Sequence, residues 1–155
     1  MFVSQTILGF LDHAQVDFDL ITHARAQTAA AAAHHAHIPI KELAKGVLLH
    51  DDADLVLAVV PASRRVNTFA IANLTDSASV QLVQEDELGF VFRDCERGAV
   101  PIIGEAFGVH SVIDDALLRA HDVYFEAGDH ERLVHMSGHE FARLMSGKLH
   151  GRISC

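Results

Sequence analysis

Two short apolar runs follow one another closely in the first half of the chain. Residues 45–50 (KGVLLH) and 55–60 (LVLAVV) are separated only by the charged residues 51–54 (DDAD). Runs of this length, rich in Val and Leu and joined by a polar turn, are typical of paired β-strands. We therefore expect a β-hairpin whose strands are largely buried.

Helices and strands alternate irregularly along the rest of the chain. Amphipathic spacing or high helix propensity predicts helices over residues 4–15, 29–37, 67–73 and 84–92. Alternating or apolar runs predict strands over residues 17–21, 79–83, 107–113, 122–126 and 133–136. Ser137 and Glu140 match a capping box that opens a last helix, with Gly147 as its stop signal. There is no internal repeat or linker, so residues 1–155 are predicted to form a single α+β domain with a mixed, largely antiparallel β-sheet or barrel flanked by helices.

The charge balance of the chain is acidic. Lys and Arg number 12 and Asp and Glu number 21, which gives a formal net charge of −9. This balance argues against a broad basic surface for DNA, and any contact with a polyanion would have to be local. No apolar run approaches the roughly 18 residues that span a membrane. Cys95 and Cys155 form no CxxC pair, and the N-terminal residues lack the basic region of a signal peptide, which favours a cytoplasmic protein with reduced thiols.

A glycine- and proline-containing stretch, residues 95–108 (CERGAVPIIGEAFG), is apolar where a solvent-facing linker would be polar. Gly98 can adopt backbone angles that a side chain disfavours, and Pro101 fixes its own φ and restricts Val100 before it. A stiff loop of this kind can lie against a cavity and present backbone N–H groups to a ligand. The alternative is an ordinary buried crossover between two elements of a sheet.

Other candidate chemistry is sparse. The twelve histidines form no HExxH motif and have no cysteine pair beside them, so a zinc site, and with it a metal hydrolase, is the poorest interpretation. Cys95 is interpreted as a buried, inert thiol in preference to a reactive one. Lys45 stands at the start of an apolar strand, where its ammonium either extends to solvent or offers a point charge to a carboxylate or phosphate.

Several segments together carry a resemblance to a known family. They are residues 22–28 (THARAQT), 45–49 (KGVLL), 55–67 (LVLAVVPASRRVN), 82–88 (LVQEDEL), 98–104 (GAVPIIG) and 123–137 (VYFEAGDHERLVHMS). In this order the chain resembles the YbaK/EbsC family of aminoacyl-tRNA deacylases, which is related to the editing domain of bacterial prolyl-tRNA synthetase. The resemblance implies a cytoplasmic hydrolase that needs no cofactor and cleaves the ester of mischarged tRNA. Its implied partners are the acceptor end of that tRNA and an aminoacyl-tRNA synthetase.

The resemblance also implies site residues. The family's lysine corresponds to Lys45, its GxxxP loop begins at Gly98, and its glycine in a late turn matches Gly128. The loop departs from the pattern, because the position four after Gly98 is Ile102 and the proline comes one place earlier, at Pro101. The residues implied to bind substrate are His23, Thr28, Ala99, Val100, Ile102 and Gly104.

A mechanism without a protein nucleophile follows from these residues. Backbone N–H groups of the Gly98 loop would stabilise the oxyanion of an ester under attack by water. Lys45 would bind the terminal phosphate or the ester, and the resemblance implies that the vicinal hydroxyl of the ribose orients the water. Asp129 and His130 form a candidate general-base pair. The rival hypothesis is a non-catalytic module of the same fold that binds a small ligand or a protein, and the shifted proline and the acidic charge favour it.

Overall fold

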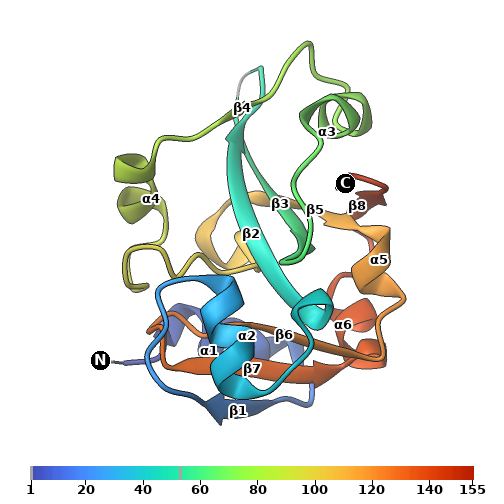
Figure 1. Ribbon diagram of the computed structural model, residues 1–155. Helices are drawn as coiled ribbons and strands as arrows, with labels where there is room; N and C mark the ends of the chain where they lie inside the picture. Colours follow the sequence, from blue (N-terminus) through green and yellow to red (C-terminus); the bar gives the residue numbers. More distant parts are fainter. Residues whose placement is uncertain (1, 53) are drawn as a thin grey trace.

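An eight-stranded mixed sheet organises the structure, a computed structural model that describes residues 2–52 and 54–155 (Figure 1). The strand order is β1-β7-β6-β2-β3-β5-β8, and β4 pairs with β2 off this path. The strands are β1 (Asp19–Thr22), β2 (Leu43–His50), β3 (Leu55–Pro61), β4 (Gln81–Leu82), β5 (His110–Asp114), β6 (Asp122–Glu126), β7 (Arg132–Ser137) and β8 (Leu149–Gly151).

The predicted hairpin is confirmed. β2 and β3 pair antiparallel, with Lys45 opposite Val60 and His50 opposite Leu55. All of β3 after Leu55 is buried, because the sheet is covered on both faces at this point.

The sheet is mixed, as the sequence predicts, and open. Antiparallel pairs are β1–β7, β6–β7, β2–β3 and β2–β4, and parallel pairs are β2–β6, β3–β5 and β5–β8. β1 and β8 stand at the two ends of the strand order. The barrel alternative is therefore wrong, whereas the α+β class and the largely antiparallel pairing are confirmed.

Six α-helices and two 3-10 turns surround the sheet in the described residues. They are α1 (Gln5–Ala14), α2 (Ala29–Ala36), α3 (Thr68–Leu74), α4 (Glu85–Val91), α5 (Asp115–Leu118) and α6 (Gly138–Leu144), with η1 (Ile40–Glu42) and η2 (Gly104–Phe107). None of these helices has the length and apolarity to cross a membrane. Ser137 caps α6 by accepting a hydrogen bond from the Glu140 N–H, so the last predicted helix is confirmed.

The main core joins the N-terminal and C-terminal helices through the sheet. Ile7 of α1, Phe125 of β6 and Phe141 of α6 are fully buried in it together with Ile102 and Ile103. The last two belong to the glycine- and proline-containing stretch, which therefore contributes to the core. This burial fixes the loop against the sheet.

Four short elements differ from the sequence-based prediction. The strand expected over residues 107–113 begins only at His110, because residues 104–107 form η2, which ends at Gly108 with φ of 78°. The strand expected over residues 79–83 is reduced to β4, whose Leu82 is exposed. α5 and β8 carry no long periodic pattern; α5 begins because the Asp114 carboxylate accepts a hydrogen bond from the Ala116 N–H.

Candidate active site

A cavity of about 200 Å³ lies where four segments distant in the sequence meet. Its walls come from the start of α2, the start of β2, the loop at Gly98 and the end of β6 with the turn that follows. Much of the wall consists of small residues: Ala26, Ala29, Ala32, Ala44, Gly46 and Gly98. The loop at Gly98 and Val100 also borders a second cavity, of about 370 Å³, whose opposite wall is α4.

Lys45 lies at the start of β2 and lines the smaller cavity. Burial lowers the pKa of its ammonium, and the positive charge of Arg65 lowers it further. Among the described residues, no carboxylate lies within ion-pair distance of Lys45, although the side chain is half-buried. The ammonium is therefore a partly desolvated charge that is not neutralised inside the protein.

The loop at Gly98 has a fixed conformation. Gly98 has φ of 84°, a conformation that favours glycine and fits the prediction for the head of an apolar loop. The Ala99 N–H donates to the Glu96 carbonyl (2.9 Å), and the Glu96 N–H donates to the Gly128 carbonyl (2.8 Å). The loop is thus tied to the turn after β6.

Two backbone N–H groups of this loop are available to a ligand. Within the described part of the chain, the N–H groups of Gly98 and Val100 donate no hydrogen bond, and both residues line the cavity. Unused donors on a rigid backbone are the groups that stabilise a developing oxyanion.

β2 itself holds the loop in place. A methyl group on Gly46 would overlap the backbone carbonyl oxygen of Pro101. Pro101 is buried and lies outside the cavity lining. Its role is therefore to pack the loop against the strand, one residue away from Lys45.

His130 lies in the turn between β6 and β7. It is buried, and its backbone has φ of 61°. The ring Nε2 lies 2.7 Å from the Arg97 carbonyl oxygen, an acceptor, so Nε2 carries the proton in the neutral ring. His130 lines the cavity and at the same time fixes the residue before Gly98.

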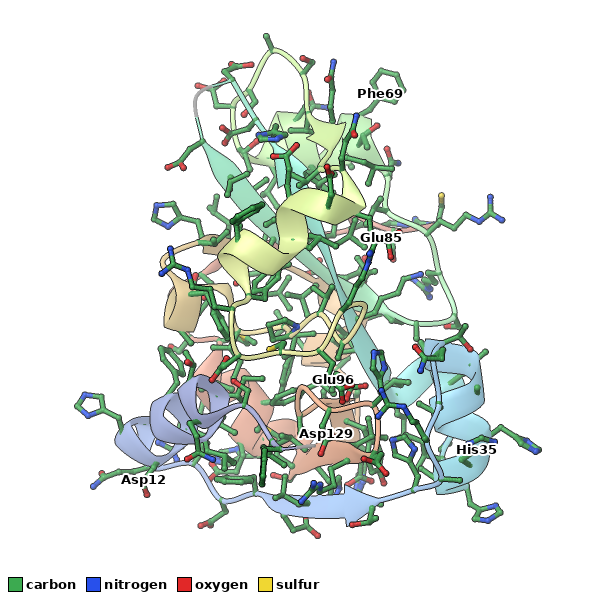
Figure 2. All side chains as sticks on the ribbon, turned by 90° about the vertical axis from the view of Figure 1, so that its left-hand side faces the viewer. Asp12, His35, Phe69, Glu85, Glu96 and Asp129 are labelled. Carbon is green, nitrogen blue, oxygen red and sulfur yellow. The ribbon has the colours of Figure 1, made fainter. Side chains whose placement is uncertain are left out.

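The predicted pairing of Asp129 with His130 does not occur. The Asp129 carboxylate is fully buried and accepts from the N–H groups of Glu131 (3.0 Å) and Arg132 (2.9 Å) and from the Arg132 guanidinium (2.8 Å). The carboxylate is therefore occupied in shaping its own turn. In Figure 2, Asp129 lies below Glu96, in the turn between β6 and β7.

Arg25 connects the loop that contains Glu96 with the turn that contains Asp129. Its guanidinium pairs with the Glu96 carboxylate and donates to the Asp129 carbonyl oxygen (3.2 Å). The neighbouring His23 is buried, with Nδ1 2.7 Å from the Ala24 carbonyl oxygen. His23 thus supports the segment that leads to α2 and lies outside the cavity lining.

Glu126, at the end of β6, is a site residue that the sequence analysis missed. It lines the cavity beside Lys45 and His130, and one carboxylate oxygen accepts a hydrogen bond from the His130 N–H (2.9 Å). Burial raises the pKa of this carboxyl, although the His130 N–H opposes the shift. Its only sequence signal is a charged residue at the end of an apolar strand, directly before the Gly128 turn.

The structure brings some of the predicted site residues together and not others. Those that line the cavity are Thr28, Lys45, Gly98, Val100 and His130. Those that lie outside its lining are His23, Ala99, Pro101, Ile102, Gly104, Gly128 and Asp129. Most of the second group are buried and hold the loop or the turn; Gly104, for example, donates its N–H to the Ser111 hydroxyl (3.0 Å).

Metal and thiol chemistry find little support in the described residues. No group of three His, Cys, Asp or Glu side chains there is placed to hold a metal ion. Burial raises the pKa of the Cys95 thiol to about 12, which is characteristic of an inert thiol.

Comparisons with known proteins bear on the family and the fold. The model of the aminoacyl-tRNA editing domain family matches residues 23–144, a range that includes all four segments around the cavity. The crystal structure of a hypothetical protein is similar with a TM-score of 0.86 at 21% identity, covering 97% of this chain and 100% of that one. A structure described as a proposed trans-editing enzyme for prolyl-tRNA synthetase has a TM-score of 0.82 at 16% identity, covering 98% and 96%. A search of curated proteins found no match. At these identities the structures establish the fold, and because the family model spans most of the chain, the protein belongs to the aminoacyl-tRNA editing domain family.

Proposed function

We propose that the protein is a freestanding deacylase that hydrolyses the ester bond of mischarged aminoacyl-tRNA. The observation that carries this proposal is the convergence of Lys45, the free N–H groups of Gly98 and Val100, and Glu126 on one small cavity. Hydrolysis of an ester on tRNA needs a cation that binds the phosphate at the RNA end, hydrogen-bond donors that stabilise the oxyanion, and a general base that activates water. The family assignment supports the same substrate class.

The size of the cavity favours a small amino acid. Pockets for drug-sized ligands usually measure about 300–1,000 Å³, and this one measures about 200 Å³. A cavity of this size admits a small aminoacyl side chain and excludes a larger one by overlap with the wall. This is the second sieve of editing, in which the cognate product is too large to enter.

In the mechanism we propose, Lys45 binds the phosphate on the 5′ side of the 3′-terminal nucleotide and places the ester carbonyl beside the loop. The Glu126 carboxylate takes a proton from a water molecule, whose oxygen attacks the carbonyl carbon. Negative charge then develops on the carbonyl oxygen, where the N–H groups of Gly98 and Val100 stabilise it. The ester C–O bond breaks, and the ribose oxygen leaves as a hydroxyl with the proton from Glu126. The products are a free amino acid and uncharged tRNA.

His130 positions these groups without taking the proton itself. Its backbone N–H donates a hydrogen bond to the Glu126 carboxylate. Its ring Nε2 donates to the carbonyl oxygen of Arg97, the residue directly before Gly98. The base and the oxyanion donors are therefore linked through one residue. Such a link keeps both at the distance that attack by water requires.

The test is a deacylation assay across a panel of aminoacyl-tRNAs, run in parallel with the Lys45→Ala variant. We expect hydrolysis above the buffer rate for tRNAs that carry small amino acids, and a Lys45→Ala rate close to that of buffer. Hydrolysis of none of the panel would favour the rival hypothesis, a binding module of the same fold. We also propose a cytoplasmic location and transient contact with an aminoacyl-tRNA synthetase, which pull-down with synthetases and cell fractionation would test.

A further inference from the structure

The positive charges of this acidic protein are unevenly distributed. Of the 12 Lys and Arg residues, five have an Asp or Glu within ion-pair distance. The other seven, among the described residues, have none. Five of those seven fall on the segments from η1 to the start of β2, the loop after β3 and the end of α5: Lys41, Lys45, Arg64, Arg65 and Arg119.

Three of these cations meet around a single depression. Lys41, Arg64 and Arg119 are exposed, and all three line a surface cavity of about 380 Å³. η1, which carries Lys41, contacts both β3 and β6, and in Figure 1 it lies at the lower end of β2 near α5. We call Lys41, Arg64, Arg65 and Arg119 the basic face.

The basic face leads to the candidate active site. Lys41 precedes Lys45 by four residues, so their Cα atoms are at most about 14 Å apart. The charge of Arg65 is close enough to lower the pKa of Lys45. A nucleic-acid strand advances about 3.4 Å per stacked nucleotide. A strand whose end lies at Lys45 therefore reaches Lys41 and Arg65 within a few nucleotides.

Among the residues that line this depression, one is acidic. Glu42 lines the same depression, and His121 beside it pairs with the Asp122 carboxylate. The depression remains positive because three cations oppose one carboxylate. Since the whole chain has a net charge of −9, the remaining surface repels a polyanion and this face is where one can approach.

We propose that the basic face binds the phosphate backbone of the tRNA acceptor arm and guides its 3′ end into the cavity at Lys45. This inference rests on the proposed function and adds to it the surface that holds the body of the substrate. Guanidinium groups match phosphate geometry with paired donors, and two arginines and a lysine around one depression suit a backbone contact. None of the exposed large apolar side chains, Phe2, Leu20, Phe69, Leu82, Phe90 and Leu149, lines this depression, so the depression lacks the apolar centre of a protein interface.

The experiment compares two double variants with equal loss of charge. Arg64→Gln with Arg119→Gln alters the basic face, and Arg143→Gln with Lys148→Gln removes two cations that are paired elsewhere. Thermal unfolding first shows that both variants are folded. The affinity of each for an uncharged acceptor-stem RNA hairpin is then measured at several salt concentrations. This measurement needs no catalysis.

We expect the basic-face variant to bind the hairpin roughly tenfold or more weakly. The slope of log affinity against log salt concentration should be about two units shallower than that of the wild type, one unit for each lost phosphate contact. The control variant should bind as wild type. On substrates, the basic-face variant should hydrolyse the aminoacyl ester of adenosine 5′-monophosphate, which keeps the phosphate that Lys45 binds, at the wild-type rate and aminoacyl-tRNA more slowly. The first substrate lacks the RNA arm and the second carries it.

A basic-face variant with wild-type affinity and salt slope overturns the proposal and leaves an acidic protein as the ligand of this face. An equal loss with the control variant also overturns it, because the effect would then be one of net charge. If wild-type protein hydrolyses no ester, the proposed function fails, and the hairpin measurement still decides whether the face binds RNA.

Discussion

Lys45 and Glu126 line the same cavity with opposite charges, and burial pushes both toward neutrality. It lowers the pKa of the lysine and raises the pKa of the glutamate. Within the described residues the two are not close enough to form an ion pair. Charged groups that are desolvated without a mutual partner are typical of sites that use them on a ligand.

Lys45→Ala should leave stability unchanged or slightly higher and abolish most activity. The pKa of Lys45 is lowered, so folding disfavours its charged form relative to the unfolded chain. In addition, the substitution breaks no ion pair of Lys45 within the described residues. Thermal unfolding and the deacylation rate measure the two effects separately. Lys45→Arg is the finer variant, since a planar fork does not replace a compact charge in a small cavity. A stable Lys45→Ala protein with normal turnover would contradict this role.

Glu126→Gln should reduce deacylation by about 10²–10⁴-fold, the usual contribution of a general base, without unfolding the protein. The glutamine oxygen can still accept from the His130 N–H. Because burial raises the pKa of Glu126, kcat/KM of the wild type should rise with pH through a value above that of an ordinary glutamate. The variant should lack this acid limb. If the pH profile of kcat/KM keeps the same acid limb in Glu126→Gln, the titrating group is a residue other than Glu126.

At the scale of elements, the contact between β2 and the Gly98 loop determines the geometry of the site. Gly46 has no room for a side chain because the Pro101 carbonyl occupies that space. This contact could not be predicted from the sequence, where Gly46 is one residue of an apolar run. The sequence predicts that Pro101 stiffens the loop through its fixed φ, and the structure adds that its carbonyl packs against Gly46 of β2.

Gly46→Ala should destabilise the protein by about 1–3 kcal/mol, as overpacked sites do, and displace the loop. Deacylation should fall even under conditions where the variant is fully folded. Gly9→Ala is the matched control, because Gly9 lies in α1 with open space around it, and the change should be neutral or slightly stabilising. Urea unfolding measures the stability of both variants, and the deacylation rate measures their activity. A Gly46→Ala protein with wild-type stability and rate would contradict the prediction.

A second contact between elements joins β1, β6 and β7. The His135 ring on β7 hydrogen-bonds to Asp19 of β1 (2.8 Å) and to Asp122 of β6 (2.9 Å) and stacks on Tyr124. Burial lowers the pKa of His135, but the hydrogen bonds to Asp122 and Asp19 outweigh it and the pKa is raised. Hydrogen bonds from His121 and His135 lower the pKa of Asp122.

His135→Gln should therefore remove a pH-dependent part of the stability. A histidine with a raised pKa stabilises fully below its unfolded pKa of about 6.5 and loses this effect as pH rises through the folded pKa. The difference in unfolding free energy between wild type and variant should be larger at about pH 5.5 than at about pH 8.5, by less than about 1 kcal/mol for so exposed a cluster. An equal difference at both pH values would show that only neutral packing is lost.

For the whole molecule, the sequence predicts the fold better than it predicts the site. The hairpin of β2 and β3, the helix capped by Ser137 and the α+β class follow from local patterns that need no tertiary information. The course of residues 98–104 does not follow, because one apolar run is divided between the cavity, which Gly98 and Val100 line, and the core, which Ile102 and Ile103 enter. Glu126 is equally hidden, since its environment depends on segments that lie far away in the sequence.

Chelation should leave deacylation unchanged. The histidines lack the spacing of a metal site, and no three potential ligands among the described residues converge. The assay is repeated with protein incubated with a chelator, prepared without a histidine tag and examined for bound metal. Activity that disappears with chelator and returns with zinc would contradict the mechanism.

The separation of the cavity segments along the chain has a consequence for folding kinetics. The parallel pair that brings β2 beside β6 at the cavity joins Leu43 with Tyr124, and the parallel pair of β3 with β5 joins Val56 with His110. Such distant pairings close large loops before they gain contacts, so folding of this sheet belongs in the slow range of about milliseconds to seconds. The hairpin that carries Lys45 can form early, before Glu126 joins it. A partly folded chain would therefore hold the lysine but lack the base and the oxyanion donors, and ester hydrolysis should return only in the last refolding phase.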